Sequence, residues 1–123
     1  MTDITATIDA HLAAYCEPDA SRRTDSITRA WAADGHLIDP PFEGQGREGI
    51  GAMTDGVLNT YPDHVFHRVT TVDEHHGYAR YGWELVGPDG KPAVTGTDFA
   101  QIGDDGRLVR IVGFFGDPVP AEA

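Results

Sequence analysis

Two aspartates and a tyrosine stand where this chain could carry out acid–base chemistry: Asp39, Asp98 and Tyr15. A carboxylate that is shielded from water has a raised pKa, so it can take or return a proton near neutral pH. Perturbed carboxylates of this kind concentrate at functional sites. Whether these three side chains are shielded depends on the elements that carry them.

Asp98 lies in a predicted β-hairpin whose register points its side chain toward the core. A turn at Pro88-Asp89-Gly90 makes three cross-strand pairs, which are Tyr81 with Asp98, Trp83 with Gly96, and Leu85 with Val94. Trp83 and Leu85 favour burial, so this face packs under the helices. The opposite face carries Arg80, Glu84, Thr95 and Thr97. A buried carboxylate needs a partner, so Asp98 is functional, or else it faces out, caps a loop or pairs with an arginine such as Arg110.

Asp39 ends an extended segment and directly precedes Pro40 and Pro41, so its backbone is stiff. A general base benefits from that rigidity, although an Asx turn into Pro40 explains the same residue. Tyr15 falls on the apolar face of the first predicted helix, where its ring packs and its hydroxyl needs a partner. Simple packing in the core explains Tyr15 equally.

The periodicity of apolar residues predicts helices first and strands afterwards. The helices are expected at residues 3–16, 21–33 and 46–61, and the strands at 64–73, 78–86, 93–102 and 108–115. The turn segments between the strands make an antiparallel meander. Together these elements predict an α+β domain over residues 1–123, with a short tail from residue 116.

Composition excludes several classes of partner. The chain has 123 residues, with 9 Lys and Arg against 20 Asp and Glu, so its net charge of −11 opposes binding to nucleic acid and to anionic lipid. No apolar stretch is long enough to cross a bilayer. Cys16 is the single cysteine, so no internal disulfide forms, and we expect a cytoplasmic protein.

The six histidines do not suggest a metal site, because none has the spacing of a zinc motif. His64 and His67 point to opposite faces of a strand, and His75 and His76 lie in a turn. Cys16 lacks the local signature of a nucleophile and is interpreted as a small buried residue. Neither a phosphate-binding glycine loop nor a dinucleotide-binding motif is present, so we expect no metal and no cofactor.

With this order of elements, the sequence resembles the nuclear transport factor 2-like superfamily, in the branch of ketosteroid isomerases and SnoaL-like polyketide cyclases. The resemblance extends from Ile4 to Gly116. It depends on short motifs, which are Trp31-Ala32-Ala33-Asp34-Gly35 before Ile38-Asp39-Pro40, Gly46-Arg47-Glu48-Gly49-Ile50, Gly96-Thr97-Asp98-Phe99, Asp105-Gly106-Arg107-Leu108 and Gly113-Phe114-Phe115. It implies a cone-shaped barrel, in which a curved antiparallel sheet of cystatin-like topology wraps around the N-terminal helices.

The resemblance also implies roles for the three residues. Asp39 matches the general base of the isomerases, and Tyr15 matches their oxyanion-hole tyrosine. Asp98 matches their protonated oxyanion-hole aspartate and also the acid–base aspartate of the cyclases. Trp31 and Thr54 stand where the isomerases have supporting tyrosines, which argues against a steroid substrate.

The leading hypothesis is therefore a cofactor-independent isomerase or cyclase that acts on a small apolar carbonyl compound. Asp39 takes the proton, and Tyr15 and Asp98 donate hydrogen bonds to the enolate oxygen. The residues expected to form the walls of the site are apolar or aromatic: Trp31, Phe66, Tyr81, Trp83, Ile111 and Phe115.

Two other functions stay open. One is a non-catalytic module of the same fold, for binding or assembly. The other is an epoxide hydrolase with an Asp-Arg-Asp arrangement, for which Arg80 and Arg110 are the available arginines. The superfamily resemblance also implies a homodimer formed through the open face of the sheet.

Overall fold

The protein folds into three helices and a seven-stranded sheet in a computed structural model that describes residues 3–122. The expected domain limits at residues 1 and 123 lie outside that range. The helices are α1 (Ile4–Ala14), α2 (Ala20–Ala30) and α3 (Gly46–Thr60). The strands are β1 (Trp31–Asp39), β2 (Phe42–Gln45), β3 (Val65–Arg68), β4 (Asp73–His75), β5 (Tyr78–Val86), β6 (Pro92–Ile102) and β7 (Leu108–Phe115).

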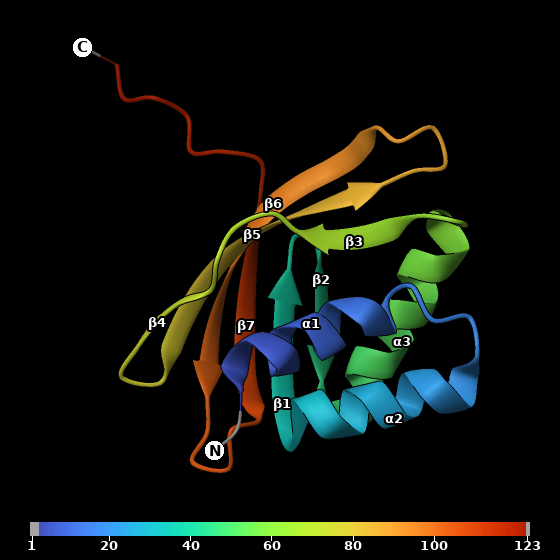
Figure 1. Cartoon of the computed structure of the whole chain (residues 1–123), viewed down its shortest axis with the longest axis vertical. Coiled ribbons are helices and arrows are strands. Elements are labelled where there is room, and N and C mark those ends of the chain that lie inside the picture. The colour runs from blue at the N-terminus through green and yellow to red at the C-terminus, as the bar shows by residue number, and fades with distance from the viewer. Residues whose placement is uncertain (1–2, 123) are drawn as a thin grey trace.

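The sheet curves around the helices, which confirms the predicted α+β fold (Figure 1). Its strand order is β2-β1-β7-β6-β5-β3, and β4 also pairs with β5. The expectation of a wholly antiparallel sheet is wrong, because β1 runs parallel to β7 while the other pairs are antiparallel. The sheet is therefore mixed. Since β2 and β3 remain as edges, it does not close into the barrel that the resemblance implies.

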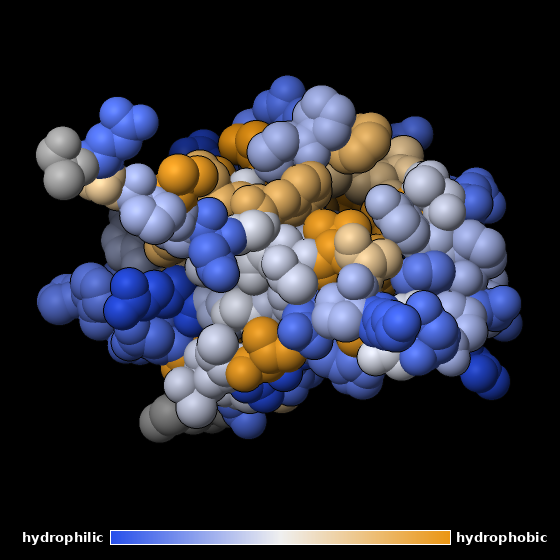
Figure 2. Space-filling view, turned by 90° about the horizontal axis from the view of Figure 1, so that it is seen from above, coloured by the Kyte–Doolittle hydropathy of each residue, from blue (hydrophilic) through white to orange (hydrophobic). Residues whose placement is uncertain are grey.

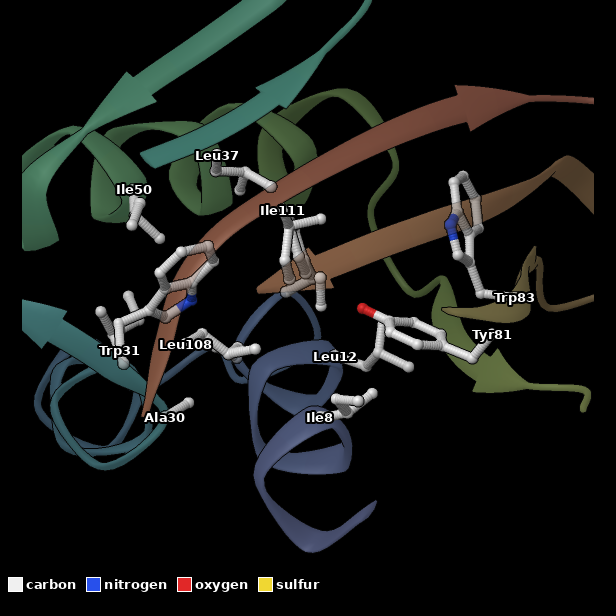
Figure 3. Close-up of a cluster of buried hydrophobic side chains, with 14 of the residues drawn as sticks. Ile8, Leu12, Ala30, Trp31, Leu37, Ile50, Tyr81, Trp83, Leu108 and Ile111 are labelled. Atoms are coloured by element: carbon white, nitrogen blue, oxygen red, sulfur yellow. The ribbon is translucent and has the colours of Figure 1, made fainter. Parts of the chain in front are cut away.

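The core lies between the concave face of the sheet and the helices. Ile8 and Leu12 of α1 meet Trp31 of β1 and Leu108 and Ile111 of β7 there, and all five are buried (Figure 3). Apolar side chains at the helix–sheet boundary stabilise the fold by leaving water. None of the helices in residues 3–122 is long and apolar enough to cross a membrane.

The second helix ends earlier than the sequence predicts. It stops at Ala30, and Trp31 is already extended, with φ −112° and ψ 141°. The Arg47 guanidinium donates to the Trp31 carbonyl at 2.8 and 3.1 Å, which satisfies an acceptor at the helix end. The Trp31 ring packs against Gly35, where a Cβ would overlap it. Trp31 pairs with Leu108 of β7 and so begins β1.

The predicted strand over residues 64–73 is two shorter strands, β3 and β4, both paired with β5. Between them the Thr70 hydroxyl accepts a hydrogen bond from the Gly82 N–H at 2.8 Å. That side-chain bond replaces a backbone partner and interrupts the ladder. The expected turn over residues 74–77 is also shorter, because Glu74 and His75 pair with β5.

The predicted hairpin register is confirmed. Asp98 faces Tyr81, Gly96 faces Trp83 and Val94 faces Leu85. Gly90, at φ +79°, occupies the turn in a conformation that glycine adopts without strain. The register fixes which side chains of β5 and β6 face the helices, and Asp98 is one of them.

Viewed from the end where β3 and the β5–β6 hairpin lie, apolar side chains gather near the middle of the surface (Figure 2). Hydrophilic side chains surround them.

Candidate active site

A row of residues across four neighbouring strands brings the two aspartates together. Asp98 of β6 pairs with Tyr81 of β5 on one side and with Gly113 of β7 on the other. On the far side of β7, Ile38 of β1 pairs with Val112, so Asp39 comes next to Gly113. The order across the sheet is therefore Tyr81, Asp98, Gly113 and Asp39.

Gly113 makes room for both carboxylates. A Cβ at this position would overlap Asp39 Oδ1 and would stand 2.9 Å from Asp98 Oδ1. Both oxygens thus lie beside the same point on β7, and the two carboxyl groups are near neighbours over a residue without a side chain. A larger residue at position 113 would separate them.

Both carboxyl oxygens of Asp98 accept a hydrogen bond. The Tyr81 hydroxyl donates to Oδ2 at 2.8 Å, and the Trp83 indole Nε1 donates to Oδ1 at 2.9 Å. In Figure 3 the Tyr81 hydroxyl and the Trp83 nitrogen both point into the molecule, on the side of Ile111. The carboxyl group itself is buried, with 4% of Asp98 exposed. The alternative of a pair with Arg110 is wrong, because Arg110 is exposed and Asp98 takes these two donors.

Burial raises the pKa of Asp98 to about 7, and the nearby Asp39 charge acts in the same direction. The hydrogen bonds from Tyr81 and Trp83 oppose this rise because they stabilise the ionised form. Loss of hydration raises the pKa of Asp39 to about 6. Within residues 3–122, Asp39 Oδ1 is a buried side-chain oxygen without a hydrogen-bond partner. The pair can therefore exchange a proton near neutral pH.

Tyr15 approaches the carboxyl pair from the helix layer. It directly follows α1, is 6% exposed, and packs its ring against Phe66 with centroids 4.8 Å apart. Burial raises the pKa of Tyr15 well above its usual value, and the charges of Asp39 and Asp98 add to this rise. The hydroxyl is therefore a neutral hydrogen-bond donor at every physiological pH.

These groups line one cavity of about 550 Å³ between the helices and the sheet. The polar lining residues are His11, Tyr15, Asp39, Glu43, Thr60 and Asp98, and the others are apolar, aromatic or glycine: Leu12, Phe42, Gly49, Ala52, Met53, Gly56, Val57, Tyr61, Phe66, Trp83, Leu85, Val94 and Phe115. A cavity of this size holds a small organic molecule. Because most of its wall is apolar, the aspartates form a polar site in a largely apolar cavity.

The comparisons with known proteins agree with this architecture. Residues 8–111 match the SnoaL-like domain, which is most of the chain. The chain belongs to the SnoaL-like family. A crystal structure of a candidate isomerase of this family from Agrobacterium tumefaciens is 33% identical, with a TM-score of 0.87, over 95% of this chain and 100% of that one.

More distant structures share the fold of this SnoaL-like chain. A candidate polyketide cyclase from Sinorhizobium meliloti is 21% identical with a TM-score of 0.69, over 93% of this chain and 95% of that one. A protein from Catenulispora acidiphila with a ketosteroid isomerase-like fold, in complex with trimethylamine, is 15% identical with a TM-score of 0.70, over 88% and 83%. No curated protein sequence matches the chain significantly.

The predicted wall of the SnoaL-like site is only partly the wall of this cavity. Phe66, Trp83 and Phe115 line it. Trp31, Tyr81 and Ile111 are buried in the core and do not line it. Tyr81 still belongs to the site through its bond to Asp98. The sequence showed that these residues are buried but not on which side of the core each one lies.

Two residues of the site were absent from the sequence prediction. His11 lines the cavity one helical turn before Tyr15, and this i, i+4 spacing was the available signal. In the sequence, Gly113 stands out only as part of a family motif, because its place between the two aspartates depends on the pairing of β1 with β7.

The other polar residues singled out in the sequence lie outside the cavity. Arg80 is exposed and pairs with Asp73 at 2.8 Å, and Arg110 is also exposed. Cys16 is half-buried, and its sulfur accepts the Phe66 N–H. In residues 3–122, no three His, Cys, Asp or Glu side chains gather in a way that could hold a metal ion.

Proposed function

We propose that this SnoaL-like protein is a cofactor-independent isomerase or cyclase that acts on a small apolar carbonyl compound by proton transfer. The observation that carries the proposal is the pair of buried carboxyl groups, Asp39 and Asp98, over Gly113 at the wall of an apolar cavity. A base whose pKa lies near the working pH is the most effective proton carrier. The pair meets that condition through burial.

Asp39 is the proposed base. Its Oδ1 is enclosed beside Gly113, while the residue as a whole stays partly accessible and lines the cavity, which leaves Oδ2 to face a ligand. Oδ2 takes a proton from the carbon next to the carbonyl. The C–H electron pair forms a C=C bond, and the carbonyl π electrons move to oxygen. Tyr15 donates a hydrogen bond to that oxygen as its charge grows.

Asp98 has a different role in this proposal from the one that the family resemblance implies. Both of its oxygens already accept hydrogen bonds from Tyr81 and Trp83. Its own proton, when present, is best donated to the unpartnered Asp39 Oδ1, which is its neighbour across Gly113. Asp98 then sets the proton affinity of Asp39 and does not bind the enolate directly.

The outcome of the reaction depends on where the enolate reacts. If Asp39 returns the proton to a different carbon, the double bond moves and the substrate is isomerised. If the enolate carbon attacks a second carbonyl group, a ring closes by an aldol-type step, and the new alkoxide takes the proton. The two family-level similarities, to a candidate isomerase and a candidate polyketide cyclase, fit these two outcomes.

The alternative functions have less support. An epoxide hydrolase of the Asp-Arg-Asp type requires an arginine beside the water, and neither Arg80 nor Arg110 lines the cavity. A non-catalytic binding module would use the same apolar cavity without any need for two adjacent carboxyl groups. Their burial costs stability, which is better explained by a chemical role.

The test measures hydrogen–deuterium exchange at the α-carbon of small cyclic ketones in D₂O by NMR, because isomerisation and cyclisation both begin with this step. We expect the wild-type protein to accelerate exchange, and Asp39→Asn to lower the rate by about 100-fold or more. Asp73→Asn, at an exposed carboxylate outside the cavity, is the matched control and keeps the wild-type rate.

Two results would contradict the proposal. If Asp39→Asn exchanges ketone protons as fast as the wild type, Asp39 is not the base. If the wild type binds the ketones in its cavity but exchanges none of their protons, the protein is a binding module.

A further inference from the structure

His11 is a buried polar side chain of the cavity that the proposed mechanism does not use, whereas the other unused polar lining residues, Glu43 and Thr60, are exposed. It lies on α1 and is only 2% exposed, yet it lines the cavity. Its ring meets that of Tyr15 edge to face, with centroids 5.2 Å apart. Because His11 and Tyr15 are one helical turn apart, their side chains lie on the same face of the helix.

One hydrogen bond fixes the tautomer of His11. The Trp31 indole Nε1 donates to His11 Nδ1 at 3.1 Å. An indole N–H has no acceptor capacity, so Nδ1 must carry a lone pair. A neutral imidazole then carries its proton on Nε2. Burial lowers the pKa of His11 to about 3, which keeps the ring neutral under physiological conditions.

The Nε2–H group is directed to the cavity. In the described part of the chain, no protein atom forms a hydrogen bond with Nε2. Asp39 Oδ1 is the one side-chain atom there that is both fully buried and without a partner, so Nε2 is not fully buried. The Nδ1 edge faces Trp31, which is completely buried in the core. The opposite edge therefore opens onto the cavity that His11 lines.

We propose that His11 Nε2–H and the Tyr15 hydroxyl form a two-donor site at the C-terminal end of α1 that binds the carbonyl oxygen of a neutral ketone. The choice of a ketone as the ligand depends on the proposed function. Both oxygens of Asp98 accept hydrogen bonds from Tyr81 and Trp83, so Asp98 does not serve as the second donor to the carbonyl oxygen beside Tyr15. A carboxylate ligand would be repelled by the negative charge of the Asp39–Asp98 pair, whereas an uncharged carbonyl oxygen accepts both bonds.

Two substitutions separate this role from a purely structural one. His11→Asn places an amide oxygen near the position of Nδ1, so it keeps an acceptor for Trp31 and loses the donor in the cavity. His11→Gln places an amide N–H near the position of Nε2, so it keeps the donor and loses the acceptor for Trp31. The thermal stability of the Gln variant should therefore be lower than that of the Asn variant, and ligand binding should follow the opposite order.

The probes are acetophenone and α-methylstyrene, which have the same shape but differ in that a C=CH₂ group replaces C=O. Their dissociation constants are measured by calorimetry. The preference is the ratio of the two dissociation constants. The wild type and His11→Gln should prefer the ketone, and in His11→Asn this ratio should fall by about two- to tenfold, which corresponds to one neutral hydrogen bond. An unchanged preference in His11→Asn, or no preference in the wild type, overturns the proposal.

NMR of the wild-type protein gives a test that needs no variant. The ¹⁵N resonances of His11 should show the Nε2–H tautomer, and acetophenone, but not α-methylstyrene, should shift the Nε2–H signal. An Nδ1–H tautomer, or no shift at saturating ketone, refutes the two-donor site. These readouts measure binding only, so they stay informative if the ketone exchange test of Asp39 fails.

Discussion

At the scale of single residues, Asp98 shows how burial and hydrogen bonding compete. Two donors, Tyr81 and Trp83, stabilise its ionised form, while loss of hydration and the charge of Asp39 destabilise it. The second pair of effects is larger, so the pKa of Asp98 lies well above that of an aspartate in water. The folded protein therefore holds protons on Asp98 and Asp39 that the unfolded chain releases.

This difference predicts that the protein loses stability as the pH rises. Between pH 4 and pH 7 the folded state binds more protons than the unfolded state, so the free energy of unfolding falls with pH through this window. For Asp98, whose pKa rises from 3.8 to about 7, the loss is on the order of 3 kcal/mol. Asp98→Asn should remove the part of this slope that Asp98 contributes and leave the part that comes from Asp39, as urea denaturation at a series of pH values would measure.

The control for that experiment changes the net charge equally at an exposed site. Asp117→Asn, in the tail, should leave the slope as it is in the wild type. If the free energy of unfolding of Asp98→Asn falls with pH as steeply as that of the wild type, Asp98 does not hold an extra proton in the folded state.

At the scale of elements, the site depends on three neighbouring strands and on the absence of a side chain in the middle one. Asp39 comes from β1, Gly113 from β7 and Asp98 from β6. β1 and β7 are far apart in the sequence and pair in parallel. The site therefore forms only when the first and the last long strands of the chain have met.

Gly113→Ala tests this arrangement. The new methyl group would overlap Asp39 Oδ1 and press on Asp98 Oδ1, so we expect a displaced Asp39, a loss of about 1–3 kcal/mol of stability and at least a tenfold slower ketone exchange. Gly51→Ala in α3 is the matched control. Its methyl group would meet only Ile27 Cδ1, at 3.9 Å, so it should stabilise the helix by about 0.5–1 kcal/mol. Normal exchange in Gly113→Ala would show that the spacing of the carboxyl groups is unimportant.

The sequence predicts the local parts of this fold well and the non-local parts poorly. The Pro88-Asp89-Gly90 turn fixes the β5–β6 register, so the inward direction of Asp98 could be predicted. The parallel pairing of β1 with β7 has no local signal, so the position of Asp39 beside Gly113 could not. His11 was missed because a lone histidine on an apolar helix face has no pattern that tells a donor from a packed side chain.

At the scale of the whole molecule, the acidic surface and the functional interior are separate. The net charge of −11 comes from carboxylates that lie mostly on the surface, whereas Asp39 and Asp98 face the cavity. The convex face of the sheet, which the helices leave uncovered, carries apolar side chains beside its polar residues Glu84, Thr95 and Thr97. It carries a row across four strands, which is Arg80, Phe99, Val112 and Ile38. Phe114 lies beside this row, edge to face with Phe99 at 5.9 Å.

We propose that these aromatic side chains form the interface of a homodimer on the convex face. Phe99 and Phe114 are 45% and 56% exposed, and a second copy would remove this apolar surface from water. Two copies with the same negative charge repel each other, so the dimer should be tighter at high salt, where that repulsion is screened. Sedimentation at micromolar concentration should therefore find a dimer in the wild type and a monomer in Phe114→Lys. Val119→Lys, which changes an exposed apolar residue of the tail, should stay dimeric. A wild-type monomer at both low and high salt would show that this face has no role in self-association.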